Sequence, residues 1–256
     1  MTNANLPVQI VLPLFSIIIV AMILMARRKQ LFIRRIQGLM AIDEAIGRAT
    51  EMGRPMLCSV GLGGIDVPTL QALAITSYII RNSARFNTRA IVPVANAPLF
   101  PVTEEAVREA YTAEGRPEQF NSDDVRFLSD RQFAFAAAVS GILYREKVAA
   151  CFLFGTFYAE ALIFSETGQQ VGAIQVAGTP SLTQIPFFIA SCDYVIIGDE
   201  FYAASAYLSR EPTLLGSLVG QDISKGILIA AILLGTLIAS ISPVYGVLLS
   251  TFLKGK

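Results

Sequence analysis

Two long uncharged stretches lie near the ends of the chain. The first, residues 8–26, holds 19 residues without a charged side chain, close to the roughly 20 that a membrane-spanning helix needs. We expect residues 1–26 to form an N-terminal transmembrane anchor, in which Pro13 is tolerated if neighbouring helices satisfy the freed carbonyl. A cleaved signal peptide is the alternative, but it would carry positive charges before its apolar core, and none precede this one.

The second stretch, residues 226–253, also lacks charge. As a helix at about 1.5 Å per residue it would be longer than the roughly 30 Å hydrocarbon layer. We predict that residues 225–256 form a C-terminal transmembrane segment, kinked near Pro243. A re-entrant hairpin turning at Pro243 is the alternative. Gly235 and Ala239, four residues apart, favour close approach of another helix.

Cations follow the first apolar stretch, and a helical pattern continues over residues 27–54. By the positive-inside bias, the N-terminus lies outside and the main domain in the cytoplasm. We therefore expect a two-pass protein of the cell inner membrane with a basic juxtamembrane helix. Its cations would lie at headgroup depth, where they favour the bilayer and anionic lipid in particular. They are Arg27, Arg28, Lys29, Arg34 and Arg35.

Residues 55–224 alternate short apolar runs with helical stretches, which predicts a cytoplasmic α/β domain. Continuous apolar runs are typical of parallel strands covered on both faces. The predicted fold is a three-layer, Rossmann-like parallel sheet of about five strands with right-handed crossovers, flanked by the two transmembrane helices. The predicted strands are Met56–Val60, Ala90–Ala95, Ala149–Phe154, Gly172–Ala177 and Asp193–Ile197. The predicted helical stretches are 67–85, parts of 98–147, 157–167, 183–191 and 200–209.

Two helix starts are readable. Asp66 is placed to cap a helix whose first turn contains Pro68, where the missing N–H does no harm. Ser129 and Gln132 match a capping box, which predicts a helix over 130–146.

Composition excludes several classes of chemistry. The 256-residue chain is 54% hydrophobic and 16% charged, with 20 basic and 20 acidic side chains and no histidine. Without histidine there is no Ser-His-Asp or Cys-His catalysis and no imidazole metal ligand. The absence of net charge argues against nucleic acid as a partner. Cys58, Cys151 and Cys192 lie in or beside predicted strands, as in a reduced core. We assign no catalytic residue, metal ligand or cofactor.

Residues 148–209 are unusual because they contain no Lys or Arg. Their helical stretches carry aromatic side chains among alanines, and helices that are apolar almost all round must be buried. One domain of this size cannot bury all of this surface. We therefore expect contacts between copies, in a ring or larger homo-oligomer. Packing under the domain's own helices could account for part of the surface.

The loops after the predicted strands supply a candidate ligand site. Ligands of parallel α/β sheets lie beyond the carboxyl ends of the strands, and glycines there allow backbone approach to a phosphate. However, Asp66 occupies the sixth position of the G-x-G-x-x-G pattern, which argues against a dinucleotide. Structural turn glycines are the competing interpretation. The candidate residues are Gly61, Gly63, Gly64, Asp66, Thr156, Glu160, Gly178, Thr179 and Asp199.

The acids among them, together with Glu200, could instead be oxygen ligands for Mg²⁺ or Ca²⁺. Asp66 and Asp199 also have a competing role as helix caps.

Three stretches carry a resemblance to a known family: residues 61–75, 154–168 and 177–191. Together with the two apolar spans, they resemble an uncharacterised bacterial and archaeal family of two-pass membrane proteins with a Rossmann-like cytoplasmic domain. The resemblance covers nearly the whole chain. It implies the architecture above and transfers no catalytic residue, because the domain's function is unknown.

The sequence thus leads to two expectations about function. The first is a membrane-anchored homo-oligomeric scaffold or organising protein at the cytoplasmic membrane face. The alternative is a membrane-tethered protein or enzyme that binds a nucleotide or phosphate ligand at the glycine loops.

Overall fold

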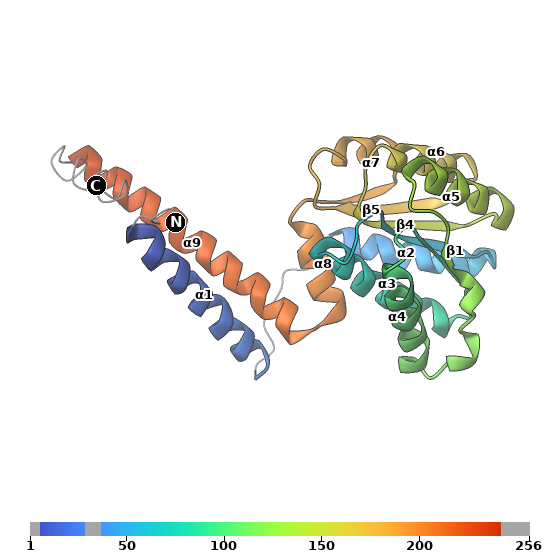
Figure 1. Ribbon diagram of the computed structural model, residues 1–256, viewed down its shortest axis with the longest axis horizontal. Coiled ribbons are helices and arrows are strands. Elements are labelled where there is room, and N and C mark those ends of the chain that lie inside the picture. The colour runs from blue at the N-terminus through green and yellow to red at the C-terminus, as the bar shows by residue number, and fades with distance from the viewer. Residues whose placement is uncertain (1–5, 29–36, 242–256) are drawn as a thin grey trace. The chain divides into compact units, whose positions relative to one another are not determined.

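The computed structural model describes residues 6–28 and 37–241 (Figure 1). The chain divides into two compact units. One unit is Arg34–Ser209 and contains the sheet. The other combines Met1–Ile33 with Arg210–Lys256 and contains a pair of long helices.

The sheet has six parallel strands in the order β3-β2-β1-β4-β5-β6, which is the order of a doubly wound sheet. The α/β class and the parallel sheet are therefore confirmed. The additional strand is β3, which has three residues, only the first of them buried. The strands are β1 (Met56–Gly61), β2 (Ala90–Val94), β3 (Val125–Phe127), β4 (Ala150–Thr156), β5 (Ile174–Thr179) and β6 (Tyr194–Ile197).

Helices cover both faces of the sheet (Figure 1). On one face α2 (Gln37–Met52), α3 (Val67–Arg85), α4 (Leu99–Ala113) and α8 (Glu200–Ser209) bury a first apolar cluster. On the other, α5 (Gln132–Glu146), α6 (Glu160–Gln170) and α7 (Ile185–Ser191) bury a second. Strands between two such layers must be apolar on both sides. This explains why β1 and β2 are buried throughout.

One predicted helix start is confirmed and the other is wrong. The Asp66 carboxylate accepts a hydrogen bond from the Thr69 backbone N–H at 2.9 Å and caps α3. The capping box at Ser129 does not form, and α5 begins at Gln132. The Ser129 hydroxyl accepts instead from the Arg131 N–H at 3.1 Å, a local turn that competes with capping.

The remaining unit pairs α1 (Leu6–Ala26) with α9 (Pro212–Ile241). A Cβ added at Gly216 would lie 2.4 Å from the Ile23 Cα, and one added at Gly220 would lie 3.0 Å from the Ile19 Cα. The helices therefore run antiparallel in close contact.

Helix α9 is continuous and includes the boundary predicted at 224/225. Pro243 lies outside the described residues. Among the residues that are described, one helix is long and apolar enough to cross a membrane, over Pro212–Leu237 with mean hydropathy 1.6. The apolar stretch in α1 is shorter, Val11–Ala26.

Candidate functional site

The predicted ligand edge contains the point where the strand order reverses, between β1 and β4. In doubly wound sheets, ligands enter the crevice at this point. Here the Leu62 N–H donates to the Thr156 carbonyl at 2.9 Å, so the two chain segments stay joined beyond β1.

Two glycines allow this junction. Gly61 has φ +82° and Gly155 has φ +120°, values that favour glycine. A Cβ at Gly61 would lie 2.3 Å from the Thr156 carbonyl oxygen, and one at Gly155 would lie 2.3 Å from the Val60 oxygen. The protein's own backbone thus fills the space that these glycines leave.

Other predicted residues also serve local packing. A Cβ at Gly63 would lie 2.3 Å from the Thr69 Oγ1, and one at Gly178 would lie 2.8 Å from the Phe154 ring. Thr179 is buried, and its hydroxyl accepts from the Ser181 N–H at 3.2 Å. Gly64 is the least crowded of the glycines predicted to bind a ligand, because a Cβ there would make only an ordinary contact, 3.9 Å from the Asn96 Nδ2.

The predicted carboxylates fall into two places. Asp66 and Asp199 are both exposed near Tyr202. Burial, followed by the negative charges of Asp199 and then Asp66, raises the pKa of the Tyr202 phenol. These two acids are therefore close enough to act on one group.

Glu160 is the first residue of α6, one of the helices over the second apolar cluster, and is fully buried. Its carboxylate accepts from the Tyr158 N–H at 2.8 Å and from the Gln132 Nε2 at 2.6 Å. It holds the start of α6 against α5. Within the described ranges, no three Cys, Asp or Glu side chains gather where they could hold a metal ion.

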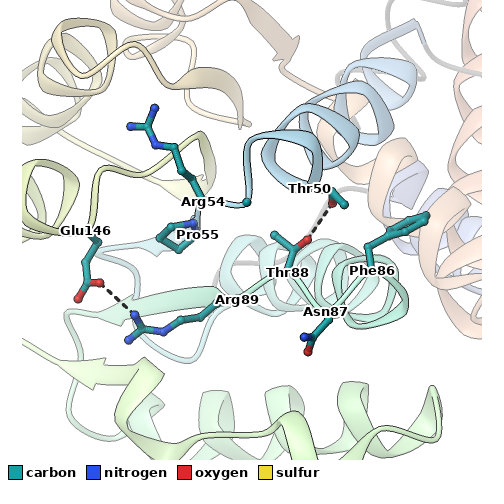
Figure 2. A pocket seen from close by; sticks show the side chains of 9 residues that line it. Thr50, Arg54, Pro55, Phe86, Asn87, Thr88, Arg89 and Glu146 are labelled. Carbon is teal, nitrogen blue, oxygen red and sulfur yellow. Dashed lines mark hydrogen bonds and ion pairs between the residues drawn. The ribbon is translucent and has the colours of Figure 1, made fainter.

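Two cavities lie at the opposite edge of the sheet, where β1 and β2 begin. They have volumes of about 280 and 440 Å³ and share Asn87, Thr88 and Arg89. Figure 2 shows the smaller one, in which the Thr50 and Thr88 hydroxyls are 2.8 Å apart. The sequence prediction missed both cavities because it considered only the carboxyl ends of the strands.

The charged groups of this edge bind one another. Arg89 contacts Asp124 at 2.5 Å and Glu146 at 3.0 Å, and Figure 2 draws the second pair. The Glu146 carboxylate is also 3.5 Å from the Arg126 guanidinium. Hydrogen bonding to Asp124 is the main cause that raises the pKa of Arg89, against an opposing effect of burial. The arrangement fits a stabilising ion-pair network better than a binding site, because both acids already have cationic partners.

The β6 end of the sheet carries exposed apolar side chains. They lie on β6, on α7 and in the loop before α7, within the segment that lacks Lys and Arg. The largest exposed fraction is 74%, at Leu182. Tyr194, whose hydroxyl donates to Glu44 of α2, lies on the other face of the sheet from α7. Exposed apolar side chains of this kind are typical of interaction sites. The residues are Leu182, Phe187, Ile189, Tyr194 and Ile197, named here the β6 edge.

The helical pair is also apolar on its outside. Phe15, Ile18, Ile19, Met22 and Ile23 of α1 are partly covered and share one helix face. Other large side chains of α1 and of the second half of α9 are exposed. These exposed residues include Leu12, Leu14, Ile17, Val20, Leu24, Ile229, Ile232, Leu233 and Leu237.

Comparison with known proteins gives one match. A family model described as a domain of unknown function (DUF6754) matches residues 1–248. No curated protein and no solved structure matches the chain. The match includes both units and agrees with the resemblance to an uncharacterised family. It assigns no activity to any residue.

Proposed function

Since the chain belongs to the DUF6754 family, a domain of unknown function, we propose from its own geometry that it is a membrane-anchored scaffold. Copies assemble through the β6 edge, and the helical pair α1–α9 holds them in the membrane. The observation that carries the proposal is the β6 edge: exposed apolar side chains at the end of the sheet, in a segment without a single cation.

The apolar exterior of the helical pair supports membrane anchoring. An α-helix satisfies its own backbone hydrogen bonds, so apolar side chains on its outside suit lipid. In water the same surface would be costly, since Ile17 alone is 66% exposed.

The flanking charges favour one orientation. Arg27 and Arg28 follow α1, and both are exposed. Cations at this end favour the cytoplasmic side and suit anionic lipid. Because the α/β unit lies in the chain between the end of α1 and the start of α9, it lies on that side too, and the N-terminus lies outside the inner membrane. Lys29, Arg34 and Arg35, also expected near lipid, lie outside the described residues.

The β6 edge supports assembly with copies of the same chain. Its five side chains are uncharged, and the charges of Glu44, Asp193 and Arg48 act on Tyr194 at its border. Leu182, Phe187 and Ile189 can therefore meet a second copy with little like-charge repulsion. Anchoring also confines all copies to one plane and one orientation, which raises their effective concentration.

The test compares two matched substitutions in the full chain. Phe187 and Val102 are 41% and 40% exposed, on helices that cover opposite faces of the sheet. We expect Phe187→Glu to reduce association at least tenfold in nanodiscs, measured by single-particle mass, and Val102→Glu to leave it unchanged. Equal association of wild type and Phe187→Glu would contradict the proposal.

The second candidate function is binding of a nucleotide or phosphate ligand at the glycine loops. The loose packing at Gly64, where a Cβ would meet only the Asn96 Nδ2 at 3.9 Å, favours it. The junction at Gly61 and Gly155 opposes it, because backbone atoms fill the space beside these glycines. The acids near Tyr202 also oppose it, because they would repel an anion. Thermal-shift measurements with ATP, GTP and inorganic phosphate, each with Mg²⁺, test it. A rise in melting temperature that Gly64→Val abolishes would support ligand binding.

A further inference from the structure

The packing of α1 on α9 fixes which parts of the two helices share one depth. Gly216 lies against Ile23, and Gly220 lies against Ile19. Ser224, one turn further, is buried, and its hydroxyl donates to the Gly220 carbonyl at 2.8 Å. Each step toward the C-terminus of α9 therefore corresponds to a step toward the N-terminus of α1.

Charged residues also flank both helices at the same end of the pair. Arg27 and Arg28 follow the last residue of α1, while Arg210 and Glu211 precede the first residue of α9. If α1 crosses the membrane up to Ala26, α9 enters it at Pro212. This is well before the uncharged stretch that begins at Gly226.

Asp222 and Lys225 are then inside the bilayer. Asp222 is ten residues beyond Pro212, or about 15 Å along a helix, half of the roughly 30 Å hydrocarbon layer. Lys225 is one turn deeper, at about 20 Å. An entry at Gly226 would instead leave Ile17, Val20 and Leu24 of α1 in water beside the first turns of α9, although all three are exposed.

These charged side chains lie on the side of α9 away from α1. At about 100° per residue, the direction of Asp222 and Lys225 is nearly opposite to that of Gly220. Both are exposed, as is Gln221 beside them. Charged side chains in a membrane face a partner or a water-filled cavity rather than lipid.

We infer that this polar face of α9, formed by Gln221, Asp222 and Lys225, is a contact between two copies within the membrane. The inference rests on the membrane anchoring proposed above. Two copies inserted in the same orientation hold Asp222 and Lys225 at similar depths, so the Asp222 carboxylate of each copy lies within reach of the long Lys225 side chain of the other. A second copy is the occupant that the charges favour, because the face carries both signs.

Depth is tested first, with the full chain in lipid nanodiscs, which expose both membrane surfaces to reagent. Asp222→Cys should react with a water-soluble maleimide at least tenfold more slowly than Val102→Cys. Wild type measures the background of the native cysteines, of which Cys58 and Cys151 are buried and Cys192 is partly exposed, and this background is subtracted from both rates. Equal rates for the two variants would overturn the inference.

Separation of the cell contents into membrane and soluble fractions distinguishes failure of the depth assignment from failure of the proposed function. A chain that is soluble without detergent contradicts both. If the chain stays in membranes but the Asp222→Cys variant reacts as rapidly as Val102→Cys, only the depth assignment is contradicted.

Contact between copies is tested by charge exchange in chains that also carry Phe187→Glu, so that the β6 edge does not hold copies together. Asp222→Lys gives a face with two cations, and Lys225→Asp gives a face with two anions. We expect each variant to associate poorly with itself and at least tenfold better with the other when differently tagged chains are co-expressed.

A neutral variant, Asp222→Asn with Lys225→Gln, covers the case in which the charged variants fail to insert. It should insert and show at least fivefold weaker association than the Phe187→Glu parent. Unchanged association of the neutral variant, or no preference between the two charged variants, would overturn the inference.

Discussion

The two ends of the sheet differ in how they meet their surroundings. At the β3 end, ion pairs cover the surface: Arg85 with Glu114, Arg89 with Asp124, and Arg108 with Glu104. At the β6 end, Leu182, Phe187 and Ile189 are exposed, and the whole segment 148–209 lacks cations. Exposed apolar side chains also occur at the β3 end, as at Phe127, but there they lie among ion pairs. The difference teaches that a low content of charge can be local, and its location is the basis of the interface proposed here.

The largest expected effect is a loss of stability at the junction of β1 and β4, which lies between the two ends of the sheet. Gly61→Ala forces a Cβ against the Thr156 carbonyl at a positive φ. We expect a loss of about 3 kcal/mol in unfolding free energy, or roughly 10 °C in melting temperature. Gly64→Ala is the control and should change stability by less than about 0.5 kcal/mol, because the added Cβ makes only an ordinary contact there. Equal effects of both substitutions, measured by thermal unfolding, would show that the junction does not constrain the sheet.

The next effect sharpens the description of the charged end. Arg89→Ala leaves the buried Asp124 without its closest cation and should cost about 2 kcal/mol. Arg108→Ala removes exposed pairs on α4 and should cost less than about 0.5 kcal/mol. Chemical denaturation of the full chain in detergent distinguishes them. A loss below about 0.5 kcal/mol for Arg89→Ala would mean that the network is only a surface feature.

The smallest effect concerns an acid at the predicted ligand edge. Asp199→Asn should change stability by less than about 0.5 kcal/mol, because the side chain is exposed. Burial is the main cause that raises the pKa of Tyr202, and the negative charge of Asp199 adds to it, so removal of that charge should lower the pKa part of the way toward the ordinary value. The difference between the alkaline absorbance titrations of the two proteins measures this shift. An unchanged titration would place Asp199 away from the phenol.

The sequence predicted the elements whose surroundings are uniform. Strands β1 and β4 lie between two helix layers, so their apolar runs are continuous and recognisable. Strand β3 was missed because only its first residue is buried. Arg126 and Phe127 are more exposed, so the strand forms no continuous apolar run. The packing of Gly216 and Gly220 on α1 was missed because Gln221, Asp222 and Lys225 interrupt the apolar pattern that follows them. The pair predicted instead, Gly235 and Ala239, lies further along α9.

The candidate site was only partly predictable for a similar reason. Glycines after strands predict that another group comes close to the backbone, but they do not identify that group. At Gly61 and Gly155 it is the neighbouring strand. The cavities at the opposite edge are lined by residues far apart in sequence, such as Thr50, Arg89 and Glu146. No local pattern marks such a set.

Assembly in the membrane is the central claim, and the mass of the native particle tests it most directly. The full chain has a mass of 27.6 kDa and can be extracted with its surrounding lipid into nanodiscs without detergent. Native mass spectrometry of these particles should give a defined multiple of the chain mass. A single population with one chain per particle, at the expression level of the native membrane, would contradict the account.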